Sequence, residues 1–186
     1  MHNADWTQVG EEGGPPIIID GQGIRVTDSD GNSWIDVGGG YCSVNVGYGR
    51  AEIANAAYDQ MLKMPYFPVG TTTPPTAMLA KKIADIAPGN LSRVFPVSGG
   101  SEANETAVKI VRAYHRRTGD SGRYKIISRK GSYHGATGGV LWFGGGPKRK
   151  SDYEPMTQGM VYAPQPNPYR CELGGKSVSE CAVKCA

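Results

Sequence analysis

The feature that most constrains the fold is the junction within residues 93–117, RVFPVSGGSEANETAVKIVRAYHRR, where a short apolar run meets a helix-forming pattern at two glycines. Residues 93–98 predict a buried strand. Residues 101–117 place apolar side chains at helical spacing and predict an amphipathic helix. Because strands that lead directly into helices are the repeating unit of α/β proteins, the junction favours a parallel sheet flanked by helices.

The alternation of strand and helix patterns continues along the rest of the chain. Residues 123–128 (RYKIIS) and 159–164 (GMVYAP) predict two further strands. Residues 136–143 and 178–186 predict short helices. We therefore expect an α/β fold over residues 71–186, with a partial, mainly parallel sheet and flanking helices.

Residues 1–70 predict a smaller N-terminal segment with a β-hairpin and a helix. Residues 23–37 (GIRVTDSDGNSWIDV) indicate the hairpin, because β-type residues flank an Asp30-Gly31 turn. Residues 50–64 place Ile53 and Met61 on one helical stripe. A second helix is expected from the prolines at 74 and 75, since proline suits a first helical turn.

Hydropathy and charge limit the classes of partner. No apolar stretch approaches the ~20 residues that a membrane helix needs, and residues 1–14 lack the pattern of a signal peptide. We therefore expect a cytoplasmic protein with no membrane partner. Basic side chains are dense over residues 112–130, where a nucleic-acid surface is an alternative. We favour a solvated helix end, which cations stabilise, and expect no nucleic-acid partner.

The cysteines give no familiar metal-binding pattern. Cys42, Cys171, Cys181 and Cys185 form no C-x-x-C pair, and the three histidines lie far from them in sequence. Cys181 and Cys185 share one face of the expected terminal helix, which is more typical of packing than of metal binding. We expect four reduced thiols and no metal site.

The glycine-serine junction is a candidate anion site. Ligands of open α/β sheets bind beyond the carboxyl ends of the strands, and the first turn of a helix presents unpaired N–H groups with partial positive charge. Gly99 and Gly100 allow close approach because no Cβ intervenes, and Ser101 adds a hydroxyl. A plain N-cap at Ser101 explains the pattern equally well. The pattern is neither a P-loop nor the dinucleotide fingerprint.

The end of the next strand favours the ligand interpretation. Residues 131–135 (GSYHG) follow that strand and place an aromatic side chain, Tyr133, among glycines. A phosphate cradle at one strand end and an aromatic plate at the next suit a flat, phosphorylated ring. His134 is a candidate acid or base, with a structural hydrogen bond as the alternative.

Together these motifs resemble the class-III, pyridoxal-phosphate-dependent aminotransferases of fold-type I. The resemblance rests on DSDGNSWIDVGGG, VNVGYGRAEIANAAYDQM, RVFPVSGGSEANETAVKI and YKIISRKGSYHGAT, and covers nearly all residues after Ile18. VNVGYGR is similar to the branch that transfers ω-amino groups from amino acids or amines to pyruvate.

The resemblance implies the cofactor pyridoxal 5′-phosphate and a role for each matching residue. Gly100 and Ser101 match the positions that hold the phosphate, Tyr133 matches the aromatic that stacks on the pyridine ring, and His134 follows it in the motif. Tyr41 lies where the family often places a substrate-facing aromatic. The resemblance further implies a small-molecule amino donor, a keto-acid acceptor and a homodimer when the protein is intact.

The resemblance also implies groups that this sequence does not match. Such enzymes use a Schiff-base lysine and a carboxylate that faces the pyridine nitrogen. None of five lysines matches that context: Lys109, Lys125, Lys130, Lys176 and Lys184. We therefore expect no catalytic residue here, an incomplete large domain with an exposed apolar face, and no transamination by this chain alone. The alternative is a non-catalytic α/β module that binds a phosphorylated small molecule.

Overall fold

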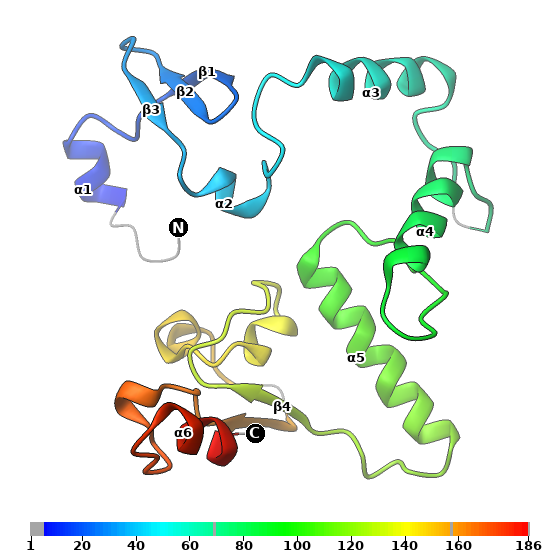
Figure 1. Ribbon diagram of the computed structural model, residues 1–186, viewed down its shortest axis with the longest axis vertical. Helices are drawn as coiled ribbons and strands as arrows, with labels where there is room; N and C mark the ends of the chain where they lie inside the picture. The colour runs from blue at the N-terminus through cyan, green and yellow to red at the C-terminus, as the bar shows by residue number, and fades with distance from the viewer. Residues whose placement is uncertain (1–5, 69, 157, 186) are drawn as a thin grey trace. The chain divides into compact units, whose positions relative to one another are not determined.

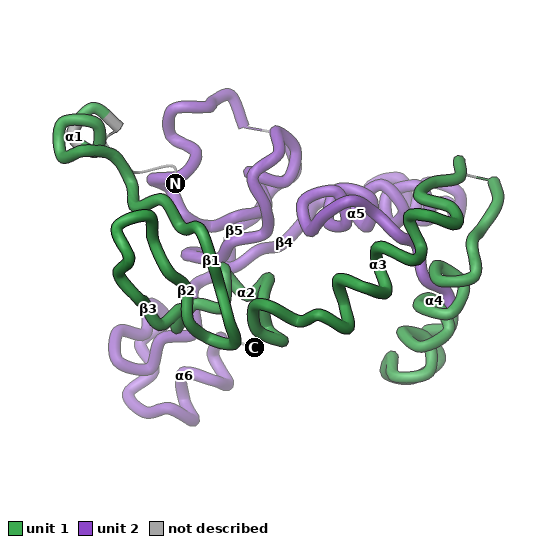
Figure 2. Tube along the Cα trace, turned by 90° about the horizontal axis from the view of Figure 1, so that it is seen from above, with its two compact units in different colours: residues 1–92 green, residues 93–186 purple. Residues whose placement is uncertain are grey.

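The computed structural model describes residues 6–68, 70–156 and 158–185, and the chain divides into two compact units, Met1–Ser92 and Arg93–Ala186 (Figure 2). Helix α4, Pro74–Ile86, lies in the first of these units. The expected domain division at residue 70 stays a prediction. Each unit is described by itself.

The described part of the first unit contains a three-stranded antiparallel sheet in the order β1-β2-β3 and several helices (Figure 1). The expected hairpin is confirmed, because β2 and β3 pair Arg25 with Ile35 and Val26 with Trp34. The expected helices are confirmed as α3 and α4. The bounds are α1 Trp6–Glu11, β1 Ile18–Gln22, β2 Arg25–Asp28, β3 Ser33–Ile35, α2 Gly39–Cys42, α3 Ala51–Lys63 and α4 Pro74–Ile86.

The hairpin turn is organised by the carboxylate of Asp28. Its Oδ1 accepts the backbone N–H of Asn32 at 2.8 Å, and its Oδ2 accepts the indole N–H of Trp34 at 2.9 Å. Gly31 adopts a φ of +84°, the left-handed conformation that ends a three-residue hairpin loop. Asp28 is only 3% exposed, and the hydrogen bonds from Trp34 and Asn32 lower the pKa of its carboxyl.

The second unit is built on a parallel strand pair, β4 and β5, with Ile126 opposite Met160 and Ser128 opposite Tyr162 (Figure 1). Both strands, the helix Gly100–Arg117 before them and the helix Val178–Cys185 after them lie where the sequence predicts. The fold class is therefore confirmed as α/β. The bounds are α5 Gly100–Arg117, β4 Ile126–Arg129, η1 Val140–Phe143, η2 Pro147–Arg149, η3 Ser151–Tyr153, β5 Met160–Ala163, η4 Pro168–Arg170 and α6 Val178–Cys185.

Two expected elements differ in the second unit. The strand expected at residues 93–98 is wrong: β4 pairs only with β5, so this segment has no ladder among the described residues, and Phe95 is 71% exposed. A strand needs a neighbour to accept its hydrogen bonds. The helix expected at 136–143 shortens to the 3₁₀ helix η1, because Gly138 and Gly139 disfavour a longer helix.

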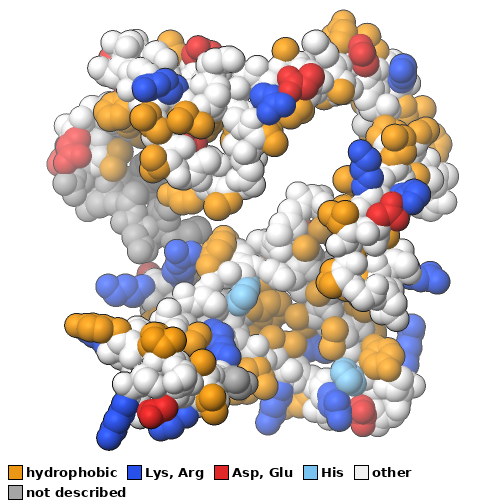
Figure 3. Space-filling view, in the orientation of Figure 1, with side chains coloured by type: hydrophobic (Ala, Val, Ile, Leu, Met, Phe, Trp, Pro, Cys, Tyr) orange, Lys and Arg blue, Asp and Glu red, His pale blue; other side chains and the backbone are white. Residues whose placement is uncertain are grey.

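The core of the second unit surrounds η1, where Val140, Trp142 and Phe143 are buried. This turn contacts both α5 and β4. In the first unit, α3 and α4 carry no buried residue, and hydrophobic side chains lie uncovered along both (Figure 3). None of the helices in the described ranges is long and apolar enough to cross a lipid bilayer.

Candidate functional site

The start of α5 presents free backbone donors. Gly99 precedes the helix in an extended conformation, and no side chain hydrogen-bonds to cap this end. The N–H groups of the first turn, at Gly100, Ser101 and Glu102, therefore lack intrahelical acceptors. The plain N-cap interpretation of Ser101 is wrong, because the N-cap position is Gly99 and Ser101 lies inside the helix.

Three side chains on one face of α5 fasten the loop that follows β4. Ser101 Oγ accepts the N–H of Ala136 at 3.2 Å. Asn104 Nδ2 donates to the carbonyl oxygen of His134 at 2.7 Å. These contacts lie 35 and 30 residues apart in sequence, so α5 and the loop form one structural element of the site.

Glu105 adds a third attachment to the same loop. Its Oε1 accepts hydrogen bonds from the hydroxyl of Thr137 and, at 3.4 Å, from the N–H of Val140. The Thr137 hydroxyl, aided by that amide, lowers the pKa of the Glu105 carboxyl. Glu105 therefore serves as a charged acceptor within the scaffold.

Gly135 allows the loop to pass close to α5. It is buried and adopts a φ of +140°. A Cβ at this position would lie 2.5 Å from Cγ1 of Val140 and 2.6 Å from Oγ of Ser101. Only glycine fits that conformation and that space.

Tyr133 and His134 lie on the exposed side of this loop. Tyr133 is 58% exposed, and the guanidinium carbon of Arg149 lies 4.8 Å from the centroid of its ring, a cation–π contact. The His134 side chain is exposed, while its backbone carbonyl is the group that Asn104 binds. The structural role of position 134 thus comes from its backbone.

The structure brings four of the five predicted site residues into one unit. Gly100 and Ser101 open α5, and Tyr133 and His134 belong to the loop fastened to it. Tyr41 lies in the first unit, 96% exposed, with a left-handed φ of 56°. Its expected substrate-facing role stays a prediction.

The sequence prediction missed the residues that hold these groups in place. Asn104 and Glu105 stand three and four positions after Ser101, which places all three on one helical face. That spacing is visible in the sequence and could have indicated them. No short stretch of sequence indicates their partners in the loop or the contact between Arg149 and Tyr133, because each contact joins residues that are far apart in the sequence.

The arrangement fits a phosphate joined to a flat ring. Ser101 Oγ accepts from Ala136, so its own hydrogen is available to an anion. The Ser101 hydroxyl and the first-turn N–H groups can each donate a hydrogen bond to the anion. Each such bond to a charged group contributes ~1.5–3 kcal/mol. The Glu102 carboxylate also lies at the start of α5, 2.9 Å from where a Cβ of residue 99 would stand. Because it would repel an anion, this exposed side chain must adopt another rotamer when the phosphate binds.

Several lysines near the second unit's strands are held by other groups. Lys130 Nζ lies 2.5 Å from the Glu172 carboxylate. Lys150 Nζ donates to the hydroxyl of Tyr162 at 2.6 Å, and Lys184 Nζ donates to the carbonyl oxygen of Gly174 at 3.2 Å. The structure thus gives these three amines structural partners.

The basic segment at residues 112–130 also has structural contacts. Arg112 Nε donates to the carbonyl oxygen of Tyr124 at 3.1 Å, and Arg123 lies 3.4 Å from Asp120. The first bond fastens α5 to the chain entering β4, and the second lies within the loop that connects them. The expectation of no nucleic-acid partner stays a prediction.

The chain as a whole is similar to known proteins. Residues 9–185 match the family described as Aminotransferase class-III. The chain is 46% identical over 159 residues to a probable aminotransferase, Rv3329, of Mycobacterium tuberculosis, covering 85% of this chain and 34% of that protein. It is 41% identical over 161 residues to a taurine–pyruvate aminotransferase of Bilophila wadsworthia, covering 86% and 35%.

Further similarity extends over most of the chain. A putrescine–pyruvate aminotransferase of Pseudomonas aeruginosa is 37% identical over 181 residues, covering 96% of this chain and 39% of that protein. The crystal structure of an (S)-enantioselective omega-transaminase from Thermomicrobium roseum has a TM-score of 0.87 and 36% identity, covering 92% of this chain and 39% of that one. This chain thus spans about a third of the length of its first relatives.

Proposed function

The chain belongs to the class-III aminotransferases, and from this premise we propose that its residues 99–140 form the cofactor-binding part of a transaminase site. The proposed cofactor is pyridoxal 5′-phosphate. The observation that carries the proposal is the uncapped start of α5, to which Ser101 and Asn104 fasten the loop that bears Tyr133. The amides supply the anion site and the loop supplies the aromatic plate.

Each residue has a defined task in this proposal. The first-turn N–H groups and the Ser101 hydroxyl bind the phosphate dianion. Asn104 fixes the His134 carbonyl, which orients the loop. Tyr133 packs its ring against the flat heterocycle. When bound, pyridoxal phosphate supplies the electron sink that lets an amino group pass between carbon skeletons.

The proposed reaction is transfer of an amino group from an ω-amino acid or amine to a keto acid such as pyruvate. Two relatives support it, because their names pair taurine and putrescine with pyruvate. The sequence resemblance to the ω-transaminase branch supports the same donor class. The donor of this protein is thus a small molecule with an amino group at one end.

We propose that this chain binds the cofactor without catalysing transamination by itself. Three lysines of the second unit are held by other groups, namely Lys130, Lys150 and Lys184, and the family resemblance matches none of the lysines considered in the sequence analysis to the Schiff-base position. The same observation favours the alternative, a non-catalytic binder of a phosphorylated small molecule. The two differ in whether the ligand must carry the pyridine ring.

One pair of ligands tests the cradle. Pyridoxamine 5′-phosphate cannot bond covalently to lysine, and ribose 5-phosphate carries a phosphate without an aromatic ring. We expect Ser101→Ala to weaken pyridoxamine phosphate binding about tenfold, the equivalent of one hydrogen bond to a charged group. Ser121→Ala, at an exposed loop serine of the same unit, is the matched control. Equal binding by the Ser101→Ala variant would refute the cradle.

A second measurement separates the two candidate functions and tests the lysine proposal. Preference for pyridoxamine phosphate over ribose 5-phosphate supports the transaminase site, whereas equal affinity supports the general phosphate binder. Borohydride treatment with pyridoxal phosphate, followed by peptide mapping, is expected to label no single lysine stoichiometrically. Stoichiometric labelling of one lysine would show a catalytic attachment point in this chain.

We also propose a homodimer for the intact protein. The uncovered apolar side chains of α3 and α4 are compatible with it, because such faces mark surfaces that either another chain or the remainder of the protein covers. Sedimentation equilibrium of the intact protein checks this proposal, and a monomer at micromolar concentration would contradict it. The cytoplasmic location stays a prediction, which cell fractionation can test.

A further inference from the structure

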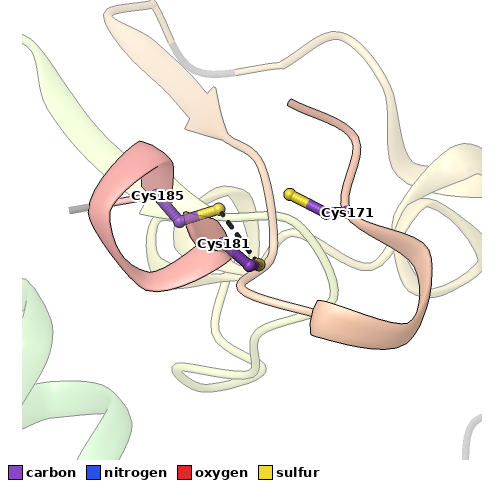
Figure 4. Close-up of side chains that lie close together, drawn as sticks. All are labelled: Cys171, Cys181 and Cys185. Atoms are coloured by element: carbon purple, nitrogen blue, oxygen red, sulfur yellow. Dashed lines mark hydrogen bonds between the residues drawn. The ribbon is translucent and has the colours of Figure 1, made fainter. Parts of the chain in front are cut away.

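Three cysteine thiols converge in the second unit, and none of them belongs to the residues of the cofactor cradle (Figure 4). Cys171 follows the short helix η4, while Cys181 and Cys185 lie one turn apart on α6. Their Sγ atoms all lie within 4.8 Å of one another, and those of Cys181 and Cys185 are 3.9 Å apart. Figure 4 shows the three sulfur atoms directed toward a common space.

Local hydrogen bonds hold the two segments in this arrangement. The hydroxyl of Ser177 accepts the N–H of Glu180 at 3.1 Å, and the Glu180 carboxylate accepts the N–H of Lys176 at 2.8 Å. This reciprocal pattern fixes the start of α6. At the other segment, Asn167 Oδ1 accepts the N–H of Tyr169 at 3.1 Å and fixes the turn that leads to Cys171.

The loop between the two segments packs tightly against the thiols. A Cβ at Gly175 would lie 2.7 Å from the backbone nitrogen of Cys181 and 3.1 Å from Sγ of Cys171. Glycine therefore allows the close approach that brings Cys171 to the helix. Because capping and close packing fix the thiols, they are preorganised for a ligand that binds all three.

The separation between Cys181 Sγ and Cys185 Sγ matches the requirement of a small thiophilic cation, and Cys171 Sγ lies within 4.8 Å of both. Two thiolates bound tetrahedrally to zinc at about 2.3 Å lie about 3.8 Å apart, close to the 3.9 Å between Cys181 and Cys185. Thiolates select soft or borderline cations such as zinc over magnesium or calcium. We propose that Cys171, Cys181 and Cys185 form a zinc site with three thiolate ligands, its fourth position being taken by water.

A disulfide explains the cluster less well. Side chains one helical turn apart have Cβ atoms about 5–6 Å apart, whereas a disulfide needs about 3.8 Å. A bond between Cys181 and Cys185 would therefore require α6 to unwind. A bond from Cys171 to either would leave the third thiol unused. Zinc engages all three in their present places.

Burial and charge allow the ion to enter and be held. Cys181 and Cys185 are 1% and 7% exposed, whereas Cys171 is half-buried and gives access from solvent. Zinc binding releases the three thiol protons to solvent. The complex then carries one net negative charge, near Lys184, whose ammonium binds the carbonyl of Gly174 in the adjoining loop.

Cobalt(II) is the probe, because it substitutes for zinc and gives visible absorption. We expect metal-free reduced chain to bind one cobalt with thiolate-to-metal charge-transfer absorption, and zinc to displace it. The number of thiols that react with Ellman's reagent should fall from four to one when zinc binds. Absence of the charge-transfer band, or no loss of thiol reactivity, would overturn the proposal.

Variants assign the ligands. Cys171→Ser and Cys185→Ser should each weaken cobalt affinity more than about 100-fold, beyond the 10–100-fold typical of losing an outer hydrogen-bond partner. Cys42→Ser, at an exposed thiol of the first unit, is the control and should bind as the wild type does. Cys171 is half-buried, so serine there keeps the size of the side chain without disturbing the core. Retention of affinity by Cys171→Ser would overturn the three-thiol site. The readout uses no cofactor and is independent of the proposed transaminase function.

Discussion

Asn104 donates a hydrogen bond of 2.7 Å to the carbonyl oxygen of His134, which stands 30 positions later in the chain. The bond joins the second turn of α5 to the loop that carries Tyr133. Because the acceptor is a backbone group, the contact sets the path of the loop rather than the orientation of the imidazole. The geometry of the proposed cradle therefore depends on a residue that touches neither the phosphate site nor the aromatic ring.

Replacing Asn104 should loosen this loop without unfolding the unit. One hydrogen bond contributes about 1 kcal/mol, so Asn104→Ala should reduce hydrogen-exchange protection of amides in residues 133–137 about fivefold. Asn55→Ala, at an exposed position of α3, is the matched control. Unchanged protection around residue 135 in the Asn104→Ala variant would show that Ser101 and Glu105 suffice to fix the loop.

Gly135 should tolerate no side chain. Gly135→Ala forces a Cβ within 2.6 Å of two side-chain atoms at a φ of +140°, and strain with overpacking costs about 2–4 kcal/mol. Gly138→Ala is the control, because a Cβ there meets nothing within 4 Å, and should change stability by less than about 0.5 kcal/mol. Urea unfolding measures both. Equal midpoints would contradict the close approach of loop and helix.

The sequence predicted the parts of the site that depend on neighbouring residues. The glycine-serine junction and the helical spacing after it locate the start of α5, because chain breaks at glycine and helical periodicity are local properties. The strand at 93–98 failed because strand formation depends on a partner elsewhere in the chain. Cys171 was not joined to Cys181 and Cys185 for the same reason: the turn that brings it to α6 is a tertiary contact.

The hairpin should weaken in acid through Asp28. Its pKa is lower in the folded hairpin than in the unfolded chain, so its contribution is complete above the ordinary value of about 4 and is lost as pH falls through the folded-state value. The indole N–H resonance of Trp34 follows this loss. Asp28→Asn should shift that resonance at neutral pH and flatten its acid dependence, whereas Asp30→Asn should leave both unchanged. An acid transition that persists in Asp28→Asn would assign it to another carboxylate.

The hydroxyl of Tyr162 should stabilise the second unit by linking three segments. It donates to the carbonyl oxygen of Trp142 at 2.5 Å and accepts from Lys150 Nζ at 2.6 Å. Tyr162→Phe keeps the ring but removes the hydroxyl that bonds the Trp142 carbonyl oxygen and Lys150 Nζ. It should therefore lower the free energy of unfolding by about 1–3 kcal/mol. Tyr153→Phe, at a residue 57% exposed, should change it by less than about 0.5 kcal/mol. Urea unfolding of both variants compares them, and equal stability would mean that water replaces the hydroxyl and that Lys150 is not held by Tyr162.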